Sequence, residues 1–430
     1  MLTTSAARQP VTSAIRRWKT VLLASLGSSL EMYDFIIYGV FAKEIASQFF
    51  PSFDSAVALI SSFGVFAVGY FSRPFGAIVL SSYGDRHGRK GVFVVSVLAM
   101  SAATVGIGIL PGYASIGIFA PLGLIALRLA QGFFLAGELP CAITYVVEEV
   151  PQKAGFVSGL VLFFLNGGIF VATLTNFAIQ SSLGAAEVQE YGWRIAFCFG
   201  GVLGLLSYAL RRSLEETQEF ARMRTCVSKK PFREMLARHG RSVLIGVGIA
   251  SVVNTGNIML FVFFPNFATT TLHYDPRVVS LSQNIGVACL SISILFSGLL
   301  SDYVPRRFVH RVGTLLLIAG SYPLYLGLVS KQVDLWTAAA LMGLVGGLVA
   351  GTYACILADL FPTVVRFSGV ALSLNLSTVI FTGLTPVAIS FLMRTTHRSA
   401  IPGFYLALIA ALAFVTGLLL KKMGGRLRTP

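Results

Sequence analysis

Apolar stretches of about twenty residues recur along the chain, separated by short polar segments. A helix needs about 20 mostly apolar residues to cross the hydrocarbon core of a bilayer. The pattern therefore predicts an all-α polytopic membrane protein with twelve transmembrane helices. The predicted spans cover approximately residues 21–42, 56–82, 91–110, 116–147, 156–180, 192–210, 242–268, 279–300, 312–329, 335–360, 367–393 and 402–420.

A polar turn rich in Gly, Asp and Arg interrupts the apolar pattern twice, at 84–90 and at 298–307, about half the chain length apart. The longest polar segment, 211–241, separates the sixth span from the seventh. We expect two pseudo-symmetric six-helix bundles, at 1–210 and 242–430, joined by a basic cytoplasmic linker at 211–241. Duplicated bundles with a site between the halves commonly move solutes across membranes.

Composition supports the membrane class. Hydrophobic residues make up 55% of the chain and charged residues 12%, about half the proportion in soluble domains. Lys and Arg total 33 against 18 Asp and Glu, and most lie at span ends that share one side with both termini. By the positive-inside rule, both termini are predicted to be cytoplasmic. The chain offers no folded basic domain for nucleic acid. The basic residues of the opposite side are Lys43, Arg194, Arg277, Lys331, Arg394 and Arg398.

Several motifs in chain order resemble the major facilitator superfamily, and within it the metabolite:proton symporters, which include carriers of citrate, 2-oxoglutarate, shikimate and proline/betaine. The resemblance implies a proton-coupled symporter of the bacterial inner membrane that takes up a small polar metabolite by alternating access. We expect an organic acid such as a di- or tricarboxylate, or alternatively a zwitterionic osmolyte, and a monomer in the bilayer. The matching segments are 30–39, 72–77, 84–90, 128–132 with Gly137 and Glu138, 192–197, 211–220, 359–366, Asn375 and 383–386.

Other functions fit less well. A drug:proton antiporter of this superfamily carries a Gly-Pro pair in span 5, whereas Asn166-Gly167-Gly168 occurs here with no proline. A sensor derived from a carrier is expected to lose its membrane acids or to gain a signalling domain, and neither sign is present. No phosphate-binding Gly-Lys-Ser/Thr loop occurs, and the five histidines are scattered. We therefore expect no enzyme activity, no cofactor and no metal site.

Ionisable residues within spans are functional candidates, because each costs about 2.5–3.5 kcal/mol to insert. Glu31 and Asp34 lie about one helical turn apart in span 1 and can share a proton. With Glu138 and Arg128 of span 4 they are the predicted proton-coupling residues; the superfamily resemblance favours that role for Arg128. Alternatively, the two acids of span 1 pair permanently with Arg73 or Arg128, and Glu138 is a structural partner for an arginine.

Substrate-binding candidates come from both halves. Arg73 lies near mid-membrane, twelve residues or about 18 Å along a helix before Asp85. A guanidinium offers paired donors that match a carboxylate, although Arg73 can instead be a counter-ion. Buried amides bind substrate without titrating, and some of them will be contacts between helices. The full set of candidates is Tyr38, Arg73, Asn254, Asn257, Gln283 and Asn375.

The two polar turns predict a cytoplasmic gate, as the family resemblance implies. The positive N-terminus of span 11, near Phe367, is expected to face Asp85, and the start of span 5 to face Asp302. Arg86, Arg89 and Arg306 extend this set. Alternatively, the turns only enforce topology. The second turn departs from the superfamily signature at Tyr303 and Pro305, so its contact is expected to be the weaker one.

Overall fold

The computed structural model describes residues 11–50, 55–212, 216 and 231–420. Every element of these residues is helical. Eleven helical segments are long and apolar enough to cross a membrane by length and composition, and α3, with 33 residues, matches the remaining predicted span. The prediction of an all-α protein with twelve long helices is confirmed.

In its described residues, the N-terminal half contains six long α-helices and three short ones. Pro74 and Pro140 lie inside α3 and α6 without ending them. The long helices are α1 (Val11–Val40), α3 (Ser55–His87), α4 (Arg89–Ile109), α6 (Phe119–Glu149), α7 (Ala154–Ser182) and α9 (Trp193–Arg211), and the short ones are α2 (Ala42–Phe49), α5 (Tyr113–Ile116) and α8 (Ala185–Glu187).

The C-terminal half repeats this plan with two interrupted helices. A π-helical segment, η4 (Met259–Phe263), joins α11 (Pro231–Ile258) to α12 (Phe264–Thr270). A second, η6 (Thr378–Thr382), joins α16 (Arg366–Ser377) to α17 (Gly383–Thr396). Such segments frequently mark functional sites. The uninterrupted helices are α13 (Pro276–Tyr303), α14 (Arg306–Val329), α15 (Leu335–Asp359) and α18 (Ile401–Leu419).

Local sequence fixes several helix starts. Asp275 caps α13 by accepting a hydrogen bond from the Arg277 amide at 2.7 Å. Asp334 caps α15 in the same way, accepting from the Thr337 amide at 2.9 Å. The Thr337 hydroxyl also donates to Asp334 at 2.6 Å, and this bond together with that from the amide stabilises the carboxylate, so the pKa of Asp334 is lowered.

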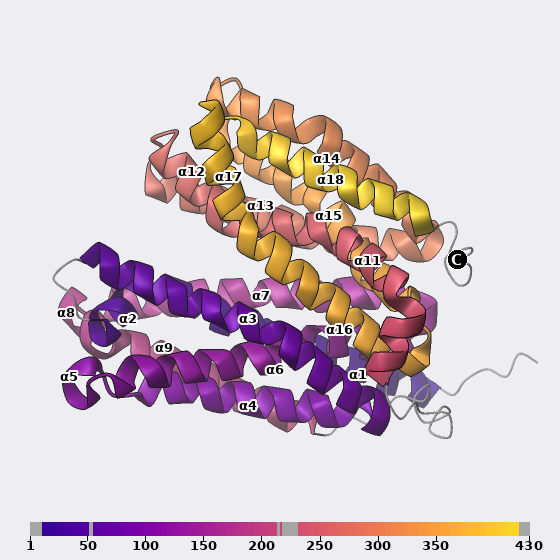
Figure 1. Cartoon of the computed structure of the whole chain (residues 1–430), viewed down its shortest axis with the longest axis horizontal. Coiled ribbons are helices and arrows are strands. Elements are labelled where there is room, and N and C mark those ends of the chain that lie inside the picture. The colour runs from indigo at the N-terminus through magenta and orange to yellow at the C-terminus, as the bar shows by residue number, and fades with distance from the viewer. Residues whose placement is uncertain (1–10, 51–54, 213–215, 217–230, 421–430) are drawn as a thin grey trace, which may run out of the picture.

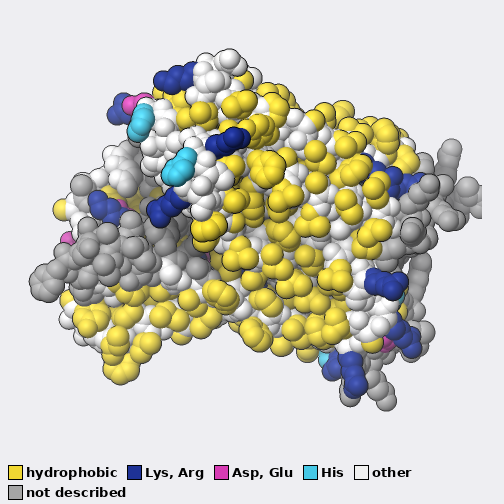
Figure 2. Space-filling view, turned by 45° about the horizontal axis from the view of Figure 1, so that its top comes forward, with side chains coloured by type: hydrophobic (Ala, Val, Ile, Leu, Met, Phe, Trp, Pro, Cys, Tyr) yellow, Lys and Arg dark blue, Asp and Glu magenta, His cyan; other side chains and the backbone are white. Residues whose placement is uncertain are grey.

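The two halves lie side by side and approach each other most closely at one end (Figure 1), where α3 ends at His87 and α16 begins at Arg366. We call this end the charged end. Here α16 packs on α3 and α6, and α7 packs on α13. Hydrophobic side chains cover the middle of the surface and charged ones lie toward its ends (Figure 2), as expected for a protein surrounded by lipid.

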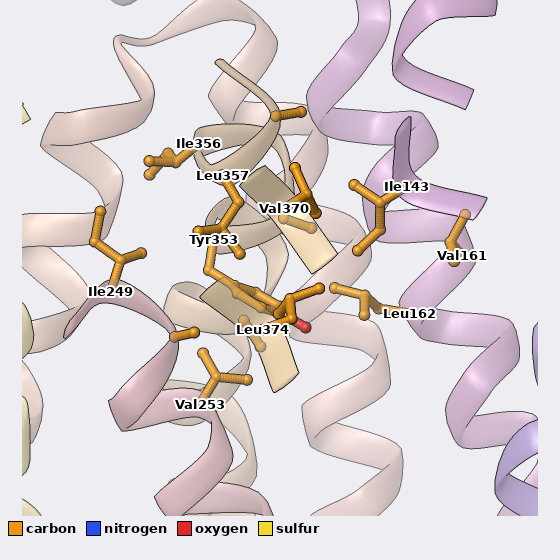
Figure 3. Packing of buried hydrophobic residues seen from close by; sticks show 14 of the residues in the cluster. Ile143, Val161, Leu162, Ile249, Val253, Tyr353, Ile356, Leu357, Val370 and Leu374 are labelled. Atoms are coloured by element: carbon orange, nitrogen blue, oxygen red, sulfur yellow. The ribbon is translucent and has the colours of Figure 1, made fainter. Parts of the chain in front are cut away.

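One buried cluster crosses the boundary between the halves (Figure 3). Ile143, Val161 and Leu162 of the N-terminal half lie opposite Val370 and Leu374 of the C-terminal half. Because the hydrophobic effect is non-directional, this cluster holds the two halves together without fixing one relative position of the halves.

Glycine permits a very close helix contact in the N-terminal half. A Cβ atom on Gly132 of α6 would lie 1.9 Å from the carbonyl oxygen of Gly69 in α3. Any larger residue therefore forces these helices apart. This contact follows the expectation that small residues line the interfaces between transmembrane helices.

The expected linker at 211–241 is partly helical. Arg211 is the last residue of α9, and α11 begins at Pro231. A non-helical residue, His239, separates a first segment with exposed Arg233 and Arg238 from the long apolar part of α11. Residues 213–215 and 217–230 of the linker lie outside the described part of the chain.

Candidate functional site

A cavity of about 1120 Å³, including space open to solvent, lies between the two halves; we call it the central cavity. Helices α1, α3, α6 and α7 form one wall, and α11, α13, α15 and α16 form the other. Its polar lining residues are Tyr70, Arg73, Asn166, Asn254, Asn257, Tyr353, Asn375, Thr378 and Thr382.

Arg73 is the only charged residue among the described residues that line the central cavity. Its guanidinium carbon lies 4.8 Å from the centre of the Tyr70 ring, which orients it by a cation–π contact. The side chain is half-buried. A guanidinium offers paired donors that match a carboxylate, so Arg73 can bind an anionic group in this cavity.

Amide side chains lie in the opposite wall, among them those of Asn254, Asn257 and Asn375, which stay predicted substrate residues. Asn254 donates to Ser377 Oγ at 3.0 Å and accepts from Thr378 Oγ1 at 3.3 Å, beside η6. Asn375 donates to the carbonyl of Ala136 in the other half at 2.9 Å. Asn375 thus joins the wall of the central cavity to the other half.

Two predicted substrate residues lie elsewhere. Tyr38 is buried, with the guanidinium of Arg128 4.1 Å from its ring centre, and Gln283 donates to the carbonyls of Leu260 and Phe261 at 3.3 and 3.0 Å. Neither is among the described residues that line the central cavity. Gln283 instead donates to two carbonyls within the π-helical segment η4.

Asp34 is buried inside the N-terminal bundle, where one of its oxygens accepts a hydrogen bond from Thr104 of α4 at 2.6 Å. Thr104 accepts from Gln131 at 2.8 Å, and Gln131 accepts from Arg128 at 2.8 Å. Hydrogen bonds therefore link the acid of α1 to the arginine of α6. The Glu31 side chain lies outside the described residues.

The second oxygen of Asp34, Oδ1, has no hydrogen-bond partner among the residues that the structure describes. A buried carboxylate with one oxygen unsatisfied is costly as an anion, so this position suits a group that gains and loses a proton. Asp34 is not among the described residues lining the central cavity.

Glu138 forms a buried ion pair with Arg211, the last residue of α9, at 2.8 Å. The guanidinium also lies 3.8 Å from the centre of the Phe93 ring. Of the two roles considered for Glu138, this geometry matches the structural partner of an arginine. Arg211 was predicted to belong to the linker, whereas its side chain is buried against Glu138.

Removing one member of this pair is expected to be strongly destabilising. In Arg211→Met, Glu138 remains buried without its cation, at an expected cost of about 3–5 kcal/mol. The melting temperature in detergent should fall, and adding Glu138→Gln should restore most of it. Arg212→Gln, at the exposed neighbouring residue, is the control. A melting temperature equal to that of the control would contradict this role.

The predicted contact of Asp85 is present at the charged end. Asp85 Oδ2 accepts from the Ser368 amide in the first turn of α16 at 2.8 Å, and we call this the first closure contact. An ion-pair network surrounds it. Arg89 Nη2 lies 3.6 Å from Asp85 and 3.0 Å from Glu148, and Arg366 of the other half lies 2.9 Å from Glu148.

The predicted contact of Asp302 is also present. Asp302 accepts from the amides of Gly155 and Phe156, at the start of α7, at 2.7 and 2.9 Å, and we call this the second closure contact. A Cβ atom on Gly155 would lie 2.0 Å from Ser301 Oγ, so the close approach requires glycine. Arg306 pairs with Asp359 and lies 3.8 Å from Asp302, within the same half.

Sequence reasoning missed three residues of these networks, namely Glu148, Asp359 and Arg366. Glu148 and Asp359 lie at corresponding ends of α6 and α15. The internal repeat that indicated Asp85 and Asp302 could therefore have indicated these two acids as well. Arg86, which was predicted with the gate, is exposed, whereas Arg89 is fully buried.

Loss of Arg366 is expected to weaken closure of the charged end. Arg366→Gln removes the charge-assisted contact with Glu148 between the halves, worth about 2 kcal/mol, or roughly thirtyfold in the ratio of closed to open states. The distance is measured between spin labels at the exposed positions Arg86→Cys and Phe308→Cys, in a chain without other cysteines. In Arg366→Gln, a larger fraction of the molecules should show a longer distance between the two labels.

The control for this measurement is Arg238→Gln, which breaks the exposed pair with Glu234. It should leave the distance distribution unchanged. If the distance distribution of Arg366→Gln equals that of the protein with Arg366, the pair of Arg366 and Glu148 does not hold the charged end closed.

The family profile of the Major Facilitator Superfamily matches residues 24–383, most of the chain. The chain belongs to the major facilitator superfamily. It is a membrane transporter rather than an enzyme, and the resemblance noted in the motifs is confirmed.

Relatives within this superfamily carry different substrates by name. The chain is 32% identical over 428 residues to the proline/betaine transporter of Salmonella typhimurium, covering 95% of this chain and 84% of that one. It is 32% identical over 415 residues to the citrate-proton symporter of Klebsiella pneumoniae, covering 95% and 92%. The proton:xylose symporter XylE has the same fold, with a TM-score of 0.77, 15% identity and coverage of 95% and 96%.

Proposed function

We propose that this transporter of the major facilitator superfamily couples the entry of protons to the uptake of a small organic acid. Arg73 carries the proposal, because a lone guanidinium in the central cavity favours a ligand with a carboxylate. The name of the Klebsiella relative, a citrate-proton symporter, agrees with this chemistry.

A zwitterionic osmolyte is the second candidate. Its carboxylate would also pair with Arg73, and its quaternary ammonium group would lie against the rings of Tyr70, Phe261 or Tyr353, which line the same cavity. The name of the Salmonella relative, a proline/betaine transporter, supports this candidate. The two candidates differ in net charge, so one experiment separates them.

Alternating access would proceed by opening the charged end while the opposite end closes over the substrate. The two closure contacts would break in that step, and protonation of Asp34 would change the charge inside the N-terminal bundle. We place the charged end and both termini on the cytoplasmic side of a bacterial inner membrane, with the protein acting as a monomer.

The test is a binding screen followed by transport. Purified protein is heated with citrate, succinate, shikimate, proline or glycine betaine, since a specific ligand raises the melting temperature. The compound that stabilises it is then supplied to proteoliposomes with an imposed pH gradient. Acid-driven accumulation that a protonophore abolishes is expected. Counterflow without any effect of the gradient would instead indicate a facilitator.

A further inference from the structure

A second cavity, of about 1060 Å³ including space open at its mouth, lies inside the C-terminal half; we call it the side cavity. Its walls come from α11, α13, α14, α15 and α18, and none of the described residues that line it is charged. Gly256 and Gly320 border it, and a Cβ atom added to either would meet nothing within 4 Å. The side cavity therefore has room and an apolar wall.

The mouth of the side cavity lies between α14 and α15. Leu316 and Leu341 line the cavity and are 46% and 42% exposed, and Gly320 is exposed beside them. Both helices are membrane-spanning candidates, so this surface faces lipid. A ligand that enters here comes from the hydrocarbon phase.

Ser321 and Tyr325 line the side cavity, and their buried hydroxyl oxygens, Oγ and Oη, have no hydrogen-bond partner among the described residues. Ser321 is 4% exposed and Tyr325 is fully buried, and they lie one turn apart on α14. A buried hydroxyl group without a hydrogen bond costs free energy. A ligand that supplies the missing partner recovers this free energy when it binds. Tyr325 is close to the end of α14 at Val329, where a polar group can approach the membrane surface.

We propose that the side cavity binds a neutral, single-chain amphiphile from the bilayer, an alkyl chain that ends in a hydroxyl group. The chain lies along Leu316, Leu317 and Leu341, and its hydroxyl group bonds to Tyr325 and Ser321. A charged headgroup is excluded, because the described lining contains no counter-ion for it.

The bound amphiphile would contact the same helix as the substrate. Val253 and Asn257 line both cavities, and the π-helical segment η4 contributes Met259 and Leu260 to the side cavity. Occupancy would therefore restrain the part of α11 whose irregular backbone allows it to bend.

The test uses the full chain in phosphatidylcholine vesicles with dodecanol that carries a photoreactive diazirine. Irradiation and mass spectrometry should find the label concentrated on peptides of α14 and α15. Gly320→Leu, which fills the open space, should reduce this labelling at least about fivefold. Tyr325→Phe keeps the ring and should reduce it about threefold to tenfold at limiting probe.

Matched controls separate binding from partition into lipid. Gly39→Leu adds the same side chain at an exposed glycine with open space around it, and Tyr322→Phe removes a hydroxyl outside the side cavity; both should label normally. Label spread evenly over lipid-facing helices, or unchanged in Gly320→Leu and Tyr325→Phe, would overturn the proposal. Transport is not required, so this result is independent of the proposed function.

Discussion

Replacing Asp34 by asparagine is expected to abolish proton-driven accumulation of substrate. The amide has nearly the same shape but cannot carry a proton between the two states of the carrier. For one coupled proton, a gradient of two pH units supports about 100-fold accumulation, and the variant should accumulate none. The measurement is uptake of the identified substrate into proteoliposomes with an imposed pH gradient.

Exchange of internal for external substrate should continue in Asp34→Asn, because it needs no net proton movement. Thr104→Ser, which keeps the hydroxyl that bonds to Asp34 at 2.6 Å, is the control and should retain coupling. If Asp34→Asn accumulates substrate as the unmodified protein does, the proton is carried elsewhere.

Arg73→Gln is expected to weaken substrate binding by roughly 30-fold or more. A carboxylate that has left water to enter the central cavity would then face no charged partner among the described lining residues. Truncating one side of a buried charge pair costs about 2–5 kcal/mol in binding. The apparent dissociation constant is measured from the rise in melting temperature with substrate concentration.

Arg73→Lys should give an intermediate affinity, because an ammonium keeps the charge but not the paired donors. Arg394→Gln, an exposed residue in the last turn of α17, is the control for loss of one positive charge. Unchanged affinity in Arg73→Gln would remove the basis for assigning a carboxylate substrate.

The arrangement of the helices was predictable because the bilayer restricts the choices. A run of twenty apolar residues has few other structures available, so all twelve predicted spans correspond to long helices. The repeated turns likewise predicted the contacts of Asp85 and Asp302, since a carboxylate and a helix N-terminus attract each other whatever packs around them.

The direction of each side chain around its helix was not predictable in the same way. Tyr38 and Gln283 lie on spans that border the central cavity but point into the protein, and only the packing of neighbouring helices decides this. Arg211 follows the last apolar residues of its span, which is typical of a charge facing water. It turns inward because Glu138 and Phe93 lie within reach.

Asp34 and Arg73 occupy separate compartments, one enclosed within the N-terminal bundle and the other beside the boundary of the two halves. In the proposed mechanism, the residue that carries the proton does not touch the substrate, so it places few demands on the identity of the substrate. A few substitutions among the amide and hydroxyl residues of the cavity wall would then change the substrate specificity without affecting proton coupling. Carriers with one common fold could in this way evolve to transport substrates as different as an organic acid and an osmoprotectant.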